Sequence, residues 1–343
     1  MSDSDRLLEA VLADPTLSDQ LKRFARLEAI FFPEVRRRRN LQYEDKPIGA
    51  SIRYVHYTSA EAAIQIIRSK RIWMRSTTCM SDFREVQHGF SLVHSYFADD
   101  RRRIAFAAAL NACHPGTLDE AIKAFDAWWG HTQVATYICS LSEHYQSEDI
   151  HGRLSMWRAF GGLGTRVAIV MNIPAFSQAA AALNVMFSPV SYLSEAEAHA
   201  VLDEIAANIA ADASFLGSCD RDLVIDRVFT LLIGAVTCLK HEGFKEEREW
   251  RAVYSPRREP SPLMEREVRV VGGVPQSIYK IPLDATLHPV LSDLDFGRIF
   301  DRLIIGPSQF PSAIGEAFQI ELEAKGVKDA SSRIFASQIP IRS

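Results

Sequence analysis

Residues 51–74, SIRYVHYTSAEAAIQIIRSKRIWM, predict a strand, a helix and a second strand in close succession. Strand-forming residues alternate from Ile52 to Tyr57, which is typical of a strand with two different faces. Thr58 and Ser59 can cap a helix, and the apolar spacing of the next residues predicts that this helix runs to about Lys70. Residues 72–74 then favour a short strand. This segment therefore predicts helices that pack on a β-sheet.

The rest of the chain continues this mixture. Apolar runs predict strands at 134–141, 166–171, 185–192 (interrupted by Pro189), 250–254, 268–271, 277–281, 303–305 and 333–341. Helical spacing predicts helices at 83–97, 104–112, 118–129, 193–240 and 313–324, with a helical turn at 156–160. Because no regular strand–helix–strand alternation occurs, we predict an α+β fold: a split, mainly antiparallel sheet with helical insertions.

Two regions flank or interrupt this predicted sheet. Residues 3–31 contain two amphipathic helical patterns, which Pro33 is expected to end, and Arg36–Arg39 are expected to lie in a solvated linker. We therefore predict a helical N-terminal appendage and linker at 1–50, followed by one α+β domain at 51–343. The Ala-rich stretch at about 194–240 is expected to be an inserted helical hairpin, divided at Gly217.

Composition excludes several classes of protein. The 343 residues are 47% hydrophobic and 24% charged, which is enough apolar material for a sizeable core, and the net charge of −4 disfavours bulk attraction to nucleic acid. No apolar run is long enough to span a bilayer, and the acidic N-terminus is unlike a secretory signal. Five scattered cysteines indicate reduced thiols without a zinc framework. These features predict a cytoplasmic protein with no membrane partner.

Common catalytic motifs are missing. The sequence has no GxxxxGK[ST], GxSxG or HExxH, and no metal site is predicted. Gly161, Gly162 and Gly164 precede a predicted strand, whereas a dinucleotide fingerprint precedes a helix, so a turn is the better interpretation.

Three short segments remain as candidates. The strand that ends in His56, Tyr57 and Thr58 places an imidazole where a helix begins, and this imidazole could bind a ligand hydroxyl or fill the core. The turn at 80–85 holds Asp82 and Glu85, for which a capping box is the simpler interpretation. The segment 139–143, CSLSE, ends a strand in small hydroxyls, and Trp157 follows at a short distance along the chain; Trp157 could form an aromatic wall or belong to the core.

The fourth candidate is the acidic run before a late strand. Residues 244–253, FKEEREWRAV, place Glu247 and Glu249 two residues apart, so on a strand they would share one face. Two carboxylates on one face repel each other unless a cleft or a counter-charge accommodates them. The alternative is a solvated charged run.

Together these segments resemble a bacterial family called domain of unknown function 2971. The resemblance spans roughly residues 54–307 and rests on seven short motifs in order: HYTS (56–59), Trp73 after a helix, MSDFRE (80–85), CSLSE (139–143), MW (156–157), REWR (248–251) and IIGP (304–307). The family usually has Asn-Asp-Pro in the turn, where this chain has Ser81 and Phe83 around Asp82.

More distantly, the His-x-Thr strand end, the serine-ended strand and the Glu-x-Glu strand resemble the ADP-ribosyltransferase superfamily. That resemblance implies a split sheet that grips NAD, as substrate, in a central cleft. It implies that His56 bonds a ribose hydroxyl, that Ser140 or Ser142 supports the cofactor, and that Trp157 or Tyr57 stacks on nicotinamide, with Thr58 beside them. Glu249 would be the catalytic glutamate and Glu247 would face the acceptor. The chain combines the His of one class with the Glu-x-Glu of another.

The implied function is ADP-ribosyl transfer or NAD hydrolysis, in a setting such as phage defence or a toxin system. The acceptor could be a protein or a nucleic acid, since the arginines at 36–39 and 101–103 fit a nucleic acid as well as solvent. Two alternatives stay open: a non-enzymatic sensor that binds a nucleotide or peptide on the same fold, and a magnesium nuclease that uses Asp82, Glu85 and Glu249. The sequence leaves the oligomeric state open.

Overall fold

The computed structural model describes residues 8–9, 11–15, 18–43, 51–79, 83–132, 136–159, 164–174, 177–257 and 259–340, except for the side chains of 83–85 and 130–132. The described residues divide into two compact units. Unit 1 comprises residues 1–48, 80–135 and 188–245, and unit 2 comprises 49–79, 136–187 and 246–343. Each unit is built from chain segments that are far apart in the sequence.

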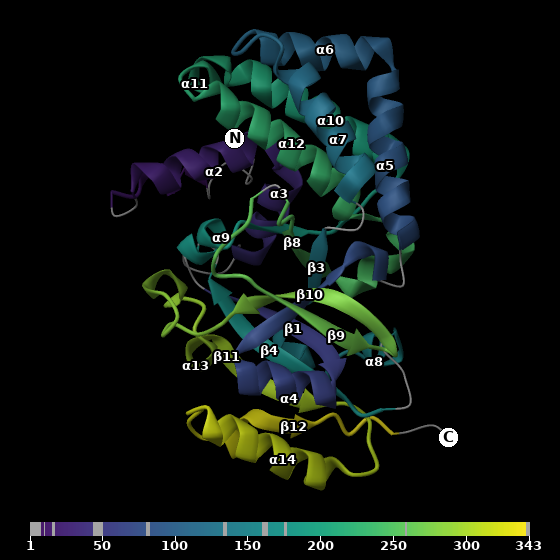
Figure 1. Cartoon of the computed structure of the whole chain (residues 1–343), viewed down its shortest axis with the longest axis vertical. Helices are drawn as coiled ribbons and strands as arrows, with labels where there is room; N and C mark the ends of the chain where they lie inside the picture. The colour runs from purple at the N-terminus through teal and green to yellow at the C-terminus, as the bar shows by residue number, and fades with distance from the viewer. Residues whose placement is uncertain are drawn as a thin grey trace. The chain divides into compact units, whose positions relative to one another are not determined.

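Unit 1 is mainly helical, and Figure 1 shows its helices gathered together. Its helices are α2 (Asp19–Phe31), α3 (Pro33–Tyr43), α5 (Phe83–Ala98), α6 (Asp100–Asn111), α7 (Thr117–Thr132), α10 (Glu195–Ala211), α11 (Ala213–Gly217) and α12 (Arg221–Thr237). Two short strands, β6 (Ser191–Tyr192) and β7 (Leu239–Lys240), pair in parallel. Buried residues such as Phe31, Phe106 and Leu202 form one apolar cluster from several of these helices. Residues of the predicted N-terminal appendage therefore pack inside unit 1.

One detail of this region differs from the sequence-based expectation. Pro33 does not end the helical region but begins α3, and Arg36–Arg39 lie in this helix instead of a solvated linker. The reason is that proline is well tolerated at the first helical position, where its missing N–H has no partner to lose. Arg37 pairs with Glu204 at 2.9 Å, and Arg39 pairs with Glu28, so the arginines hold α3 against its neighbours.

Unit 2 contains the sheet. Its strands are β1 (Ser51–Ser59), β2 (Arg71–Ser76), β3 (Tyr137–Glu143), β4 (Arg166–Pro174), β5 (Val185–Pro189, whose last two residues belong to unit 1), β8 (Glu249–Tyr254), β9 (Glu265–Val271), β10 (Val274–Pro282), β11 (Phe300–Ile305) and β12 (Ile334–Ala336). The strand order is β12-β11-β4-β1-β3-β2-β10-β9, and β8 pairs with β3 and β5. Strand β12 pairs in parallel with β11, and the other pairs whose register is known within this sheet are antiparallel. The predicted mixed fold with a mainly antiparallel sheet is confirmed at this level.

Short helices accompany the sheet. They are α4 (Ala60–Ser69), α8 (Leu154–Ala159), α9 (Gln178–Ala182), α13 (Phe296–Ile299) and α14 (Pro311–Ala324). Single 3-10 turns lie at Thr77–Cys79, Gln146–Glu148, Pro289–Leu291 and Ala330–Arg333, and a longer one at Glu242–Glu247 spans the boundary between the units. Ser59 caps α4 as predicted, since its side chain accepts a hydrogen bond of 3.1 Å from the backbone N–H of Ala62.

Candidate functional site

The sheet opens where β1 and β2 meet β3. Strand β1 pairs with the C-terminal end of β3, where Val55 faces Ser142, whereas β2 pairs with the N-terminal end, where Ser76 faces Tyr137. Both strands therefore lie along one edge of β3 and separate from each other there. His56 is the first β1 residue beyond the last β1–β3 pair. His56 therefore lies where β1 and β2 separate along this edge of β3.

The imidazole of His56 bridges to β3. Its Nδ1 lies 3.0 Å from the backbone oxygen of Ser140. A carbonyl oxygen can only accept, so Nδ1 carries the proton and donates it. Burial lowers the pKa of His56, and the ring is therefore neutral at pH 7 with Nε2 as an acceptor. An acceptor nitrogen of this kind can bind a ligand hydroxyl.

The two candidate serines of β3 differ in their surroundings. Ser142 is buried and faces Glu249 on β8, while Ser140 is half-buried and faces Arg251. Within the described part of the chain, the Ser140 hydroxyl oxygen is buried and has no hydrogen-bond partner. A buried hydroxyl without a partner is unusual and marks a position where a ligand or water can bind.

Glu249 begins β8 and is held by its own strand. The Arg251 side chain donates from Nε to Oε1 at 2.9 Å and from Nη2 to Oε2 at 3.2 Å. Both side chains are buried, with exposed fractions of 7% for Glu249 and 4% for Arg251. The carboxylate is thus neutralised by a two-point ion pair in this structure.

Strand register separates the predicted histidine from the predicted acid. Val55 faces Ser142 and Ser142 faces Glu249, so these three side chains share one face of the sheet. Successive side chains on a strand point to opposite faces, so His56 leaves β1 on the other face. The structure brings the strands of His56, Ser140 and Glu249 together as neighbours, but it directs Ser140 and Glu249 to one face and His56 to the other.

The aromatic candidates are part of a packed cluster. The rings of Tyr57 and Trp157 meet edge to face with centroids 4.8 Å apart, and both residues are 5% exposed. The Tyr57 hydroxyl accepts a 3.0 Å hydrogen bond from the backbone of Arg153, and Trp157 Nε1 donates to the His151 oxygen at 2.8 Å. Both rings therefore have protein partners where stacking on nicotinamide was predicted. Thr58 follows Tyr57 in β1, is half-buried and pairs with Val167.

The predicted alternation of Glu247 and Glu249 on one strand is wrong. Glu247 ends a 3-10 turn, and β8 begins only at Glu249. Between them, Arg248 has a φ of 45°, in the left-handed region, which interrupts the extended backbone that alternation requires. The sequence pattern gave no sign of this local conformation, because Arg has no preference for it.

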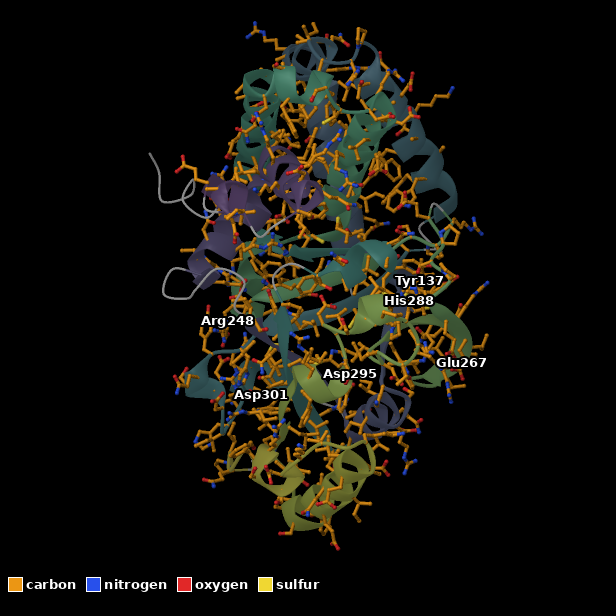
Figure 2. The ribbon with its side chains drawn as sticks, turned by 90° about the vertical axis from the view of Figure 1, so that its left-hand side faces the viewer. Tyr137, Arg248, Glu267, His288, Asp295 and Asp301 are labelled. Carbon is orange, nitrogen blue, oxygen red and sulfur yellow. The ribbon has the colours of Figure 1, made fainter. Side chains whose placement is uncertain are left out.

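Sequence reasoning missed a cluster of charges in unit 2. Asp149 accepts from Arg53 at 2.7 Å and from His144 Nε2 at 3.0 Å, and Arg302 lies 3.1 Å away. Burial of the Asp149 carboxyl raises its pKa. The hydrogen bonds from Arg53 and His144 and the charges of Arg53 and Arg302 lower it by more, so the pKa of Asp149 lies below its ordinary value. Arg53 also pairs with Asp301 at 2.6 Å, which Figure 2 labels on the same side of the view as Arg248. The only sequence signal was that polar residues interrupt apolar strands.

Unit 1 contains an open pocket. Its volume is about 680 Å³ when the solvent-filled space at its mouth is included. Its walls are mostly apolar and include Phe31, Leu92, Leu202 and Leu239. None of the predicted site residues lines it. The nuclease alternative depends on Asp82 and the Glu85 side chain, which lie outside the described residues, as does most of the glycine turn at 161–164.

The described residues contain no group of three or more His, Cys, Asp or Glu side chains arranged to hold a metal ion. Among them there is also no helix with the length and apolar character needed to cross a bilayer.

Comparison with known families supports one resemblance. Residues 156–252 match the family described as a protein of unknown function (DUF2971). This segment includes the MW motif at 156–157 and the REWR motif at 248–251, while HYTS, CSLSE and IIGP lie outside it. No curated protein and no solved structure matches the chain.

Proposed function

We propose that this chain is an ADP-ribosyltransferase-like protein that binds NAD where β1 separates from β3. The observation that carries the proposal is the adjacency of three strands. His56, Ser140 and Glu249 come from β1, β3 and β8, which are successive neighbours although the residues span almost two hundred positions of sequence.

Two groups near the split, His56 on one face of the sheet and Ser140 on the other, suit hydroxyls of a dinucleotide. The neutral His56 ring keeps Nε2 as an acceptor because Nδ1 donates to Ser140. The Ser140 hydroxyl has no partner in the described part of the chain and can bond a ligand oxygen. Because the two side chains leave opposite faces, they would bond different hydroxyls of the dinucleotide, and each neutral hydrogen bond contributes about 1 kcal/mol.

The transfer step assigns a further role to Glu249. Its carboxylate would bond the 2′-hydroxyl of the nicotinamide ribose as positive charge develops on that sugar. The carbon–nitrogen bond to nicotinamide breaks, and nicotinamide leaves with the electron pair. The acceptor, or water in NAD hydrolysis, bonds to the same carbon and loses a proton. For this role Glu249 must exchange its contact with Arg251 for the substrate.

The second candidate function is NAD or nucleotide binding without turnover. Two observations favour it: Arg251 already holds both oxygens of Glu249, and His56 and Glu249 leave opposite faces of the sheet. A sensor of this kind would need the His56 side of the split and not the carboxylate.

One experiment separates these functions. The purified full chain is titrated with NAD by calorimetry, and release of labelled nicotinamide is followed in the same preparation, with and without cell lysate. A transferase or hydrolase releases nicotinamide, a sensor binds NAD without release, and the absence of binding overturns both.

Single substitutions test the proposed roles of His56 and Glu249. We expect His56→Ala to weaken NAD binding about tenfold, in line with one lost hydrogen bond. For the enzyme, Glu249→Gln should keep NAD binding but lower nicotinamide release at least about 100-fold. Retained binding also shows that this variant is folded. Glu246→Gln is the matched control, because its side chain is exposed and its carboxylate has no role in the proposal.

A further inference from the structure

Strand β9 ends the sheet and leaves one edge open. It pairs with β10 on one side, and no other strand in the described part of the chain pairs with its second side. Figure 1 shows β9 beside β10, and Figure 2 labels Glu267 of β9 at the outer margin of unit 2. Val268 and Val270 are 71% and 66% exposed. Edge strands with exposed apolar side chains are templates for pairing with another strand.

The β9–β10 turn determines which backbone groups point outward. Gly272 and Gly273 both have positive φ, as a two-residue type I′ hairpin requires, so Val271 and Val274 form a hydrogen-bonded pair. Hydrogen-bonded and non-hydrogen-bonded pairs alternate along an antiparallel ladder. Pro275, which has no N–H, accordingly falls in a non-hydrogen-bonded pair. By this alternation the N–H and C=O groups of Arg266, Val268 and Val270 point away from β10.

We propose that β9 pairs antiparallel with β9 of a second copy of this chain, across a two-fold axis at Val268. This register sets Val268 against Val268 and Arg266 against Val270 of the second copy. All three outward-facing residues then form hydrogen-bonded pairs, with two hydrogen bonds at each pair. The two sheets become one continuous sheet.

Charge selects this register. Centred on Val268, it places Glu267 opposite Arg269 of the second copy in both halves of the dimer. The two nearest registers that also match outward-facing groups are centred on Glu267 and on Arg269. They place Glu267 against Glu267, or Arg269 against Arg269, and like charges that face each other directly are unfavourable.

The charged side chains are available at the surface for this contact. Glu267 and Arg269 lie on one face of β9 and form an ion pair of 2.6 Å, with exposed fractions of 29% and 43%. Lys280 also pairs with Glu267 from β10. A second copy would extend this to a cluster of six charges across the axis, three from each copy, while the valines would cover each other on the opposite face. The contact is small, so association should be reversible and depend on concentration.

The test is sedimentation of the full chain across micromolar concentrations. Wild type should shift from monomer to dimer. Glu267→Arg and Arg269→Glu should each stay monomeric, because each places like charges across the axis. An equimolar mixture of the two variants should dimerise, since one copy then presents two arginines to the two glutamates of the other.

A third variant removes hydrogen bonds without changing a charge. Val268→Pro deletes the outward N–H of each copy, and so both hydrogen bonds of the central pair, without touching the β10 ladder. It should abolish the dimer, whereas Arg101→Glu, an exposed charge reversal in α6, should not. A wild-type chain that is monomeric throughout overturns the proposal. So does a dimer that the single variants do not disturb, or a mixture no more associated than its components.

Discussion

The Glu249–Arg251 ion pair determines how much the Glu249 carboxylate contributes to the free energy of unfolding. Both side chains are buried, and removing one partner of a buried ion pair takes from the other charge the contact that offsets its burial. We expect Glu249→Gln to lower the free energy of unfolding by about 3 kcal/mol, and Glu249→Leu with Arg251→Met to recover most of it. Urea unfolding of the two variants checks this. A double variant as unstable as the single one would show that the pair itself stabilises unit 2.

His56 should make stability depend on pH. Burial lowers its pKa from the ordinary 6.5, so below that pH the unfolded chain binds a proton that the folded ring does not. The free energy of unfolding should therefore fall as the pH drops from 6.5 toward the pKa of the folded ring. The pKa of Asp149 is lowered from 3.8, so its contribution is lost only in more acidic solution.

A conservative variant isolates the histidine. His56→Asn keeps an N–H that can donate to Ser140 but removes the titration, and its unfolding free energy should change less between pH 7 and 5. Urea unfolding at both values measures the difference. Equal slopes for His56→Asn and wild type would mean that another group, such as His144, whose pKa burial also lowers, produces the effect.

Sequence reasoning identified the residues at the split but not how they are directed. His56 and Ser140 could be selected because polar groups at strand ends are visible as a pattern. The direction of His56 follows from the pairing of its neighbour Val55 with Ser142, a residue 87 positions further along the chain. Neither segment alone determines this register. The partner of Glu249 is Arg251, two residues along the predicted strand, and the sequence contained this pair without indicating that both would be buried.

Helix α4 follows β1 directly, and its start can be tested. The Ser59 side chain accepts from the Ala62 N–H at 3.1 Å, which satisfies one of the free donors of the first turn. Ser59→Ala should lower the free energy of unfolding by about 1 kcal/mol, and Ser59→Asp should restore it because aspartate caps equally well. Urea unfolding measures both variants. An Ala variant as stable as wild type would contradict this role.

Local patterns predicted most elements because their signals are local. The strand at Ser51–Ser59, the cap at Ser59 and the break of the strand at Pro189 each follow from a few neighbouring residues. The sequence-based predictions were wrong where a residue type is compatible with two local backbone structures. Pro33 can end one helix or begin another, and the choice depends on the packing of α3 in unit 1. Arg248 adopts a left-handed backbone that its own type does not favour.

The division into units could not be predicted along the chain, because each unit joins three separate segments. Leu110 lies in the apolar cluster of unit 1, and Ile304 lies in that of unit 2, and both are fully buried. Replacing either with alanine should lower the free energy of unfolding by about 2–5 kcal/mol through lost contacts and a cavity.

Since each cluster is contained in its own unit, Leu110→Ala should speed amide hydrogen exchange mainly in unit 1, and Ile304→Ala mainly in unit 2. Exchange measured by mass spectrometry checks both variants against wild type. If either substitution speeds exchange equally throughout the chain, the two clusters unfold together, and the units are one cooperative structure.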